Sequence, residues 1–167
     1  TQETCLLAQR FEKLKPDGLL IVTPYYNKPP QRGLVLHFQA VAHATKLPII
    51  VYNVPSRTGV TMNVETVAEL AKGNSNIVGV KEAAGKIEII KNLASSVPKD
   101  FQILSGDDET FVEAMSLGAH GVISVVSHVI PKMCVDAART LRTSEGITEV
   151  SRQIFVESNP IPVKWVL

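Results

Sequence analysis

The stretch Ile77-Val-Gly-Val-Lys81-Glu-Ala-Ala-Gly85 joins a short apolar run to a single lysine and then to a glycine that ends the run. Such a run is typical of a strand in a parallel sheet that helices cover on its faces. Loss of hydration at the end of a buried strand favours the neutral amine of Lys81, and a neutral amine attacks carbonyl carbons. Lys81 is therefore a candidate nucleophile. The alternative is a strand-end lysine whose ammonium group reaches solvent.

The bulk composition fits one globular domain. The chain has 167 residues, 45% of them hydrophobic, and a formal net charge of +1. The charges are scattered, which disfavours a nucleic-acid partner and favours a small-molecule one. Cys5 and Cys134 have no metal or disulfide spacing, and no apolar run reaches the ~18 residues of a membrane span. We expect a cytoplasmic protein with reduced thiols and no membrane partner.

Apolar runs alternate with amphipathic segments along most of the chain. The predicted strands are 19–22, 48–52, 77–80, 102–104 and 121–124, and the predicted helices are 4–15, 32–46, 64–72, 86–95, 109–117 and 131–141. This order predicts an α/β fold with five βα units and parallel strands. An open doubly wound sheet and a (β/α)₈ barrel both fit it, and both place function at the carboxyl ends of the strands.

Polar residues and one glycine lie at the carboxyl ends of the predicted strands, where parallel strands share one rim. They are Thr23, Tyr25, Tyr26, Tyr52, Asn53, Ser56, Arg57, Lys81, Glu82, Ser105, Gly106, Asp107, Asp108 and Ser124. Such a set suits Schiff-base catalysis. Lys81 would attack a ketone, a tyrosine hydroxyl would move protons, and the planar fork of Arg57 would hold a carboxylate.

These residues also have purely structural interpretations. Tyr52 could cap a strand end, and Arg57 could be a surface turn residue. Asp107 and Asp108 precede a predicted helix, and we interpret both as N-caps.

Several other catalytic motifs are missing from the sequence. The histidines include no His-Glu-x-x-His pair, and there is no Gly-x-Gly-x-x-Gly run, Gly-Lys-Ser/Thr loop or Gly-x-Ser-x-Gly elbow. Gly118-Ala-His-Gly121 fits a turn from helix to strand better than a phosphate site. A zinc hydrolase, a nucleotide-binding protein and a serine hydrolase are thereby disfavoured, and we predict no metal site.

Six segments, in order along almost the whole chain, resemble the dihydrodipicolinate synthase family of pyruvate-dependent class I aldolases. They are Thr23-Pro-Tyr-Tyr-Asn-Lys-Pro29, Tyr52-Asn-Val-Pro-Ser-Arg-Thr-Gly59, Val80-Lys-Glu-Ala-Ala-Gly85, Leu104-Ser-Gly-Asp-Asp108, Gly118-Ala-His-Gly-Val-Ile-Ser124 and Glu157-Ser-Asn-Pro-Ile-Pro-Val-Lys164. The resemblance implies a (β/α)₈ barrel, with residues 1–127 as strands about 4 to 8 and residues 128–167 as the start of a C-terminal helical region. It also implies a cytoplasmic homotetramer that condenses pyruvate with aspartate 4-semialdehyde for diaminopimelate and lysine synthesis.

The resemblance assigns catalytic roles to three residues. Lys81 would form the Schiff base with pyruvate, so that no separate cofactor is needed. Tyr52 would be the central proton relay, and Tyr26 would be lent to the site of a neighbouring subunit.

Other positions would bind ligands by the same resemblance. Arg57 would hold the carboxylate of the semialdehyde, while Gly106 and Ile123 would line the pocket. Tyr25 would contribute to a lysine feedback site or pack in an interface.

The sequence also departs from the family pattern. The Thr-Thr-Gly-Glu turn that completes the proton relay is absent, the region 140–153 is a few residues short, and Ala84 stands where threonine is common. We therefore expect these residues to be part of a longer enzyme. N-acetylneuraminate lyase and 2-keto-3-deoxy acid aldolases use the same lysine and tyrosine, although Arg57 favours a short acid semialdehyde. A catalytically silent truncated homologue is the remaining alternative.

Overall fold

Five parallel strands joined by helices form the chain, and the computed structural model describes all of residues 1–167. The strands are β1 (Leu19–Val22), β2 (Ile49–Asn53), β3 (Ile77–Glu82), β4 (Gln102–Ser105) and β5 (Gly121–Val122). The helices are α1 (Gln2–Glu12), α2 (Gln31–Ala44), α3 (Pro55–Thr58), α4 (Val64–Gly73), α5 (Ile87–Ser96), α6 (Phe111–Ser116), α7 (Pro131–Thr140), α8 (Glu145–Ile154) and α9 (Ile161–Val166), with a 3-10 turn η1 (Val126–His128). The predicted alternation is confirmed, but α3 lies in a segment for which we predicted neither a helix nor a strand.

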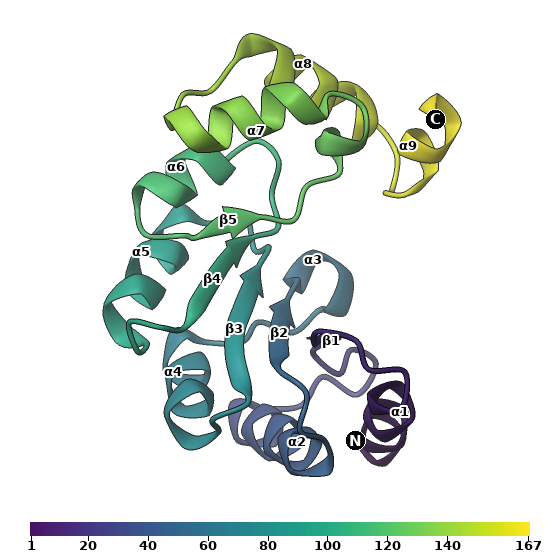
Figure 1. The fold of residues 1–167 in the computed structure, drawn as a ribbon, viewed down its shortest axis with the longest axis vertical. Coiled ribbons are helices and arrows are strands. Elements are labelled where there is room, and N and C mark those ends of the chain that lie inside the picture. The colour runs from purple at the N-terminus through teal and green to yellow at the C-terminus, as the bar shows by residue number, and fades with distance from the viewer.

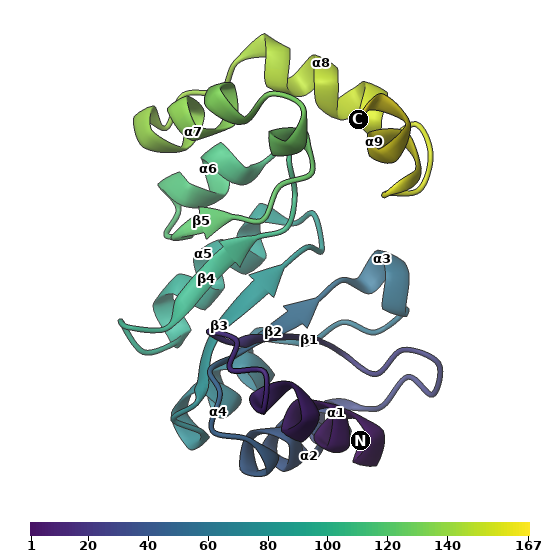
Figure 2. The same cartoon turned by 45° about the vertical axis from the view of Figure 1, so that its right-hand side comes forward.

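The strand order decides between the two architectures that the alternation left open. The order is β1-β2-β3-β4-β5, and every neighbouring pair is parallel. A doubly wound sheet reverses its order at a switch point and carries helices on both faces. Here the order never reverses, and α2, α4, α5 and α6 follow the outer side of a curved sheet (Figure 1, Figure 2). The sheet is therefore an arc of a (β/α)₈ barrel, and the doubly wound alternative is wrong.

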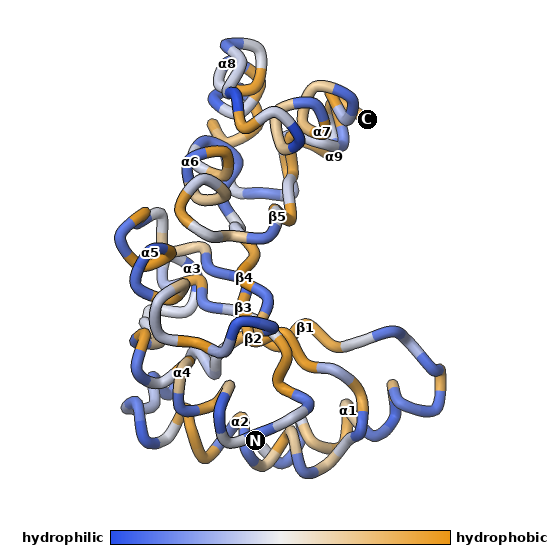
Figure 3. The backbone as a smooth tube through the Cα atoms, turned by 60° about the vertical axis from the view of Figure 1, so that its left-hand side comes forward, coloured by the Kyte–Doolittle hydropathy of each residue, from blue (hydrophilic) through white to orange (hydrophobic).

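Apolar side chains hold the sheet and the outer helices together. A cluster of 20 buried residues fills the space between them, and Leu34, Phe38, Ile49 and Leu93 in it are fully buried. Figure 3 shows the apolar character of β1 and the polar character of the loop that follows it. Because burial of apolar surface is the main favourable term in folding, this cluster fixes the strand ends that carry the polar rim.

The pairing of β2 with β3 sorts their last residues onto two faces. Tyr52 lies opposite Lys81, and Asn53 lies opposite Glu82. Since side chains alternate along a strand, Tyr52 and Lys81 share the inner face, while Asn53 and Glu82 share the outer face under the helices. Burial agrees, because Asn53 is 0% and Glu82 4% exposed, whereas Tyr52 and Lys81 are partly exposed.

Three helices follow β5, in the region predicted as helical from the family resemblance. A second apolar cluster joins α7 and α8 to α6 and η1 and consists of Phe111, Val112, Val126, Cys134, Ala137 and Ile147. This cluster combines residues from both sides of the predicted boundary at 127, and the boundary itself stays a prediction. None of the helices is long and apolar enough to span a membrane.

Candidate active site

A cavity of 410 Å³ opens at the carboxyl ends of the strands. Its walls come from the segments that follow β2, β3, β4 and β5, and from the distant region around α8 and α9. The lining residues are Tyr52, Val54, Ser56, Arg57, Lys81, Ala83, Gly106, Asp107, Asp108, Glu109, Ile123, Val125, Ser151, Phe155 and Asn159. The cavity thus brings together Lys81, Tyr52, Arg57, Gly106 and Ile123, which the sequence predicted as site residues.

Lys81 and Tyr52 lie against each other in this cavity. Lys81 Nζ is 4.3 Å from the centre of the Tyr52 ring, because the two residues are register partners on one face. Burial lowers the pKa of the Lys81 ammonium, an effect that Asp108 opposes and Arg57 reinforces. Burial also raises the pKa of the Tyr52 hydroxyl. The site therefore pairs an amine with an increased neutral fraction and a hydroxyl that keeps its proton.

Gly106 makes room for the lysine side chain. A Cβ at this position would lie 2.9 Å from Lys81 Cε and 2.7 Å from Ala83 Cβ, closer than real Cβ contacts. The Gly106 N–H donates to the Glu82 carbonyl at 2.8 Å, which holds the turn after β4 beside β3. A glycine is thus required here for steric reasons, and the course of the Lys81 side chain depends on it.

Arg57 is carried by the short helix α3. Pro55 fits the first turn because its φ is fixed, and Gly59 ends the helix with φ 65°, a value that a side chain would strain. Arg57 Nη2 donates to the carbonyl oxygen of Asn159 at 3.0 Å, across 102 residues of sequence. The guanidinium group therefore lies at the cavity with further donors of its planar fork available for a ligand.

The two aspartates after β4, Asp107 and Asp108, accept hydrogen bonds from different segments. Asp107 Oδ1 accepts hydrogen bonds from the backbone of Glu109 and Thr110, both at 3.0 Å, and so stabilises the turn that precedes α6. The N-cap of α6 itself is Thr110, so the predicted N-cap role is wrong for Asp107. The same prediction is wrong for Asp108. Its Oδ2 accepts from the backbone N–H groups of Val125 and Val126, at 2.8 and 3.3 Å, and ties the loop after β5 to the loop after β4.

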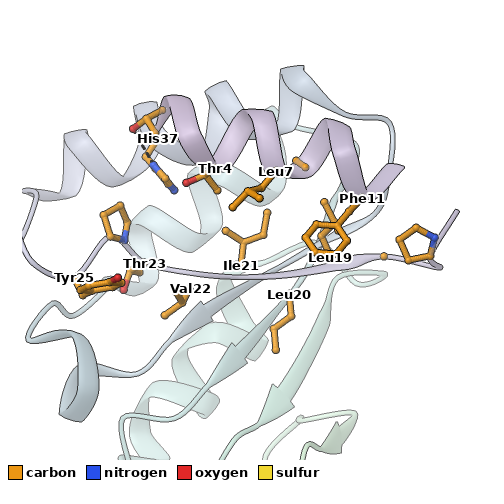
Figure 4. A pocket seen from close by; sticks show the side chains of 15 residues that line it. Thr4, Leu7, Phe11, Leu19, Leu20, Ile21, Val22, Thr23, Tyr25 and His37 are labelled. Carbon is orange, nitrogen blue, oxygen red and sulfur yellow. Dashed lines mark hydrogen bonds between the residues drawn. The ribbon is translucent and has the colours of Figure 1, made fainter. Parts of the chain in front are cut away.

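Tyr25 and Tyr26 lie outside this cavity. Both follow β1, and they are 63% and 94% exposed. Tyr25 lines a second, mostly apolar cavity of 520 Å³ between α1 and β1, near Ile21 and His37 (Figure 4). A single chain does not bring either tyrosine to Lys81, and their predicted roles in a neighbouring subunit and a feedback site stay predictions.

The structure adds residues to the site that the sequence did not reveal. Ser151, Phe155 and Asn159 line the cavity from the C-terminal helical region, and no local pattern marks them. Asn53 and Glu82 were predicted on the rim with Lys81, but their side chains lie on the outer face and form a hydrogen bond directly behind the site. No group of three or more His, Cys, Asp and Glu side chains is arranged to hold a metal ion.

Fold and site together define a class. The chain is part of a (β/α)₈-barrel protein whose carboxyl-end cavity is built around a half-buried lysine and a tyrosine.

Comparisons with known proteins narrow this class to one family. The chain matches the model of the dihydrodipicolinate synthetase family over residues 1–167. The 4-hydroxy-tetrahydrodipicolinate synthase of Bdellovibrio bacteriovorus is 44% identical over 178 residues, which cover 100% of this chain and 60% of that protein. The chain therefore belongs to the dihydrodipicolinate synthetase family, and it spans about 60% of the length of this relative.

Solved structures agree with this assignment. The dihydrodipicolinate synthase from Thermotoga maritima superposes with a TM-score of 0.88 at 42% identity, covering 98% of this chain and 59% of that one. The chloride-inhibited dihydrodipicolinate synthase from Acinetobacter baumannii, solved in complex with pyruvate, gives a TM-score of 0.87 at 40% identity, with 98% and 59% coverage. Both confirm the barrel fold of the chain.

Proposed function

We propose that the protein is a 4-hydroxy-tetrahydrodipicolinate synthase that condenses pyruvate with L-aspartate 4-semialdehyde through a Schiff base on Lys81. The observation that carries this proposal is the placement of Lys81 Nζ, 4.3 Å from the Tyr52 ring and with a lowered pKa, in a cavity that also holds Arg57. The relatives with that activity, one of them in complex with pyruvate, support the same choice.

The reaction follows from the chemistry of the lysine. The neutral amine of Lys81 adds to C2 of pyruvate, and loss of water gives an iminium ion. The iminium withdraws electrons, so that C3 loses a proton and the resulting enamine attacks the aldehyde carbon of the semialdehyde. The amino group of the semialdehyde then displaces Lys81 from C2, which closes the ring and frees the lysine.

Tyr52 and Arg57 complete the proposed roles. The Tyr52 hydroxyl, next to the amine and protonated at neutral pH, donates and recovers the protons of these steps. Arg57 binds the carboxylate of the semialdehyde through its planar fork, which is a reason to favour a short acid aldehyde over a sugar. No separate cofactor takes part in this scheme.

Borohydride reduction of the full-length protein with pyruvate, followed by peptide mass mapping, tests the proposal. The expected result is a reduced pyruvate adduct on the peptide that contains Lys81, and condensation activity with aspartate semialdehyde. Absence of an adduct on Lys81 would rule out the enzyme. An adduct together with cleavage of sialic acid, but no condensation, would assign the protein to a related aldolase.

Assembly and regulation are part of the same proposal. Tyr26, which is 94% exposed, would enter the site of a neighbouring subunit in a homotetramer. Mixing inactive Tyr26→Ala and Lys81→Arg proteins should then restore some activity, because some sites would contain both native residues. Tyr25 would contribute to a lysine site, which a Tyr25→Ala variant with altered lysine inhibition would support.

A further inference from the structure

A buried polar pair lies directly behind the Lys81 and Tyr52 side chains, on the opposite face of the sheet. Asn53 and Glu82 are the next residues of β2 and β3, and they are register partners. Asn53 Nδ2 donates to Glu82 Oε2 at 2.7 Å. With 0% and 4% of their surface exposed, both side chains are closed off from solvent.

The surroundings of this pair fix the direction of every hydrogen bond. Met62 N–H donates to Asn53 Oδ1 at 2.9 Å, so the amide nitrogen of Asn53 must face Glu82. The other carboxylate oxygen, Oε1, accepts from Ala84 N–H at 2.7 Å. A donor thus faces each oxygen of Glu82, and both oxygens must act as acceptors to satisfy these donors.

No cation neutralises this carboxylate. The single ion pair within 4.0 Å in the chain joins Lys132 to Asp136, on α7. Burial raises the pKa of Glu82, and the hydrogen bonds from Asn53 and the backbone counteract that shift. A buried carboxyl group without a cationic partner is costly, so its presence beside the site calls for a role.

The pair joins the two strand ends that carry the reactive side chains. Tyr52 precedes Asn53 and Lys81 precedes Glu82, so a shift between the two strand ends at Asn53 and Glu82 also shifts Lys81 relative to Tyr52. The bond to Ala84 also fixes the turn that follows β3. Mispositioning by about 1 Å can reduce a rate by about 100-fold.

We propose that Asn53 and Glu82 are positioning residues, whose hydrogen bond across the outer face holds Lys81 against Tyr52 on the inner face. The catalytic part of this inference rests on the proposed Schiff-base function. The placement of the Lys81 amine does not rest on it, because amine reactivity can be measured without pyruvate.

Reversal of the hydrogen bond provides the sharpest test. In Glu82→Gln, the new amide group places a donor against either Asn53 Nδ2 or the Ala84 N–H. In Asn53→Asp, two carboxylates face each other. The double variant restores complementarity, since the new amide at 82 donates to the new carboxylate at 53 while the Met62 and Ala84 bonds persist. It replaces the weak Asn53 Nδ2 bond to the Met62 carbonyl, at 3.4 Å, with a contact between two acceptor oxygens.

The first readout is the pH profile of Lys81 acetylation, measured by trace labelling and peptide mass mapping in the full-length protein. In each single variant the Lys81 amine should move away from the Tyr52 ring and toward solvent. Its titration midpoint should then rise toward that of an ordinary lysine. Arg57 and Asp108, the charged groups that act on Lys81, are unchanged in every variant. Asn53→Asp adds a carboxylate that would itself raise the midpoint, whereas Glu82→Gln adds none, so Glu82→Gln is the decisive single variant. The second readout is the rate of borohydride-trapped pyruvate adduct, which should fall about 10- to 100-fold and recover in the double variant.

Asn76→Asp is the matched control. Asn76 lies just before the opposite end of β3 and donates to the carbonyls of Ala42 and Thr45 at 2.9 and 3.0 Å. This variant should lose stability without any change in the Lys81 profile. If Glu82→Gln does not fold, Glu82→Asp, which withdraws both oxygens by one methylene, replaces it.

Two outcomes would overturn the proposal. One is a folded single variant with the native Lys81 profile; the other is a double variant that regains stability but not the profile. If the native protein forms no pyruvate adduct, the proposed function fails, while the acetylation profiles still decide whether this pair positions Lys81.

Discussion

The two ends of the parallel sheet use the same kind of hydrogen bond for different purposes. At the amino end, Asn76 Nδ2 donates to the carbonyls of Ala42 and Thr45. Glu12 accepts there from Thr45 Oγ1 and from the Lys46 N–H, at 3.1 and 3.2 Å. At the carboxyl end, the side-chain amide of Asn53 donates directly to the carboxylate of Glu82.

The two sets of hydrogen-bonded side chains differ in the residues beside them. At the amino end, the strand residues beside Asn76 are the buried Ile49 and Ile77, which have no chemistry to position. At the carboxyl end, the adjacent residues are Tyr52 and Lys81, which face an open cavity. A group of hydrogen-bonded polar side chains does not by itself mark a site. Such a group marks a candidate site when its members are next in sequence to reactive side chains.

The largest effect should come from Lys81→Arg. A guanidinium group stays protonated in proteins, so it cannot attack pyruvate. Condensation activity should fall by about 1000-fold or more, and the borohydride adduct should disappear. Lys72→Arg on α4, toward the amino end, is the control and should behave like the native protein. Retention of the adduct after Lys81→Arg would contradict the proposal that the reactive amine lies at the carboxyl end of the sheet.

Tyr52→Phe should rank next. The ring and its packing remain, but the proton donor is lost, which predicts a fall in kcat of about 100- to 10,000-fold. Trapping of the adduct at high pyruvate concentration separates this effect from misfolding, because Lys81 is intact. A kcat close to that of the native protein would show that another group moves the protons.

Gly106→Ala tests the contrast between the two ends of the sheet by crowding the Lys81 side chain. The added Cβ would lie 2.9 Å from Lys81 Cε, so the lysine must move, and we expect a loss of about 100-fold in kcat/KM. Gly73→Ala at the end of α4 is the control, since nothing lies within 4 Å of the added Cβ. That variant should keep full activity and gain up to about 1 kcal/mol of stability, measured by urea unfolding.

The smallest effect should come from Glu12→Gln at the amino end. One of its two accepted bonds can survive, and the site is partly exposed, so the free energy of unfolding should fall by only about 1 kcal/mol. Activity and the Lys81 profile should stay unchanged. A shift in either would mean that the amino end also positions the amine.

Periodicity predicted much of the fold because the strands are mainly apolar and amphipathic helices separate them. It could not choose between a barrel and a doubly wound sheet, since that choice depends on strand order, which only pairing reveals. The site followed from the shared rim, which correctly brought Lys81, Tyr52 and Arg57 together.

Other features of the site depend on packing between segments that are distant in sequence. Asp108 precedes a helix and therefore matched an N-cap, but its carboxylate bonds to the backbone of Val125 and Val126. Asn159 meets Arg57 across 102 residues, and no local pattern encodes such a contact. Burial of Glu82 likewise appears only once α4 and its preceding segment cover the outer face.

The Arg57–Asn159 contact also sets an order of events during synthesis. Each strand pairs with its neighbour in sequence, so Tyr52 and Lys81 can meet once β3 has left the ribosome. The anchor of Arg57 emerges only with residue 159. A nascent chain thus brings Lys81 to Tyr52 well before its Arg57 guanidinium group is tethered, and translation through α7 and α8 separates the two steps.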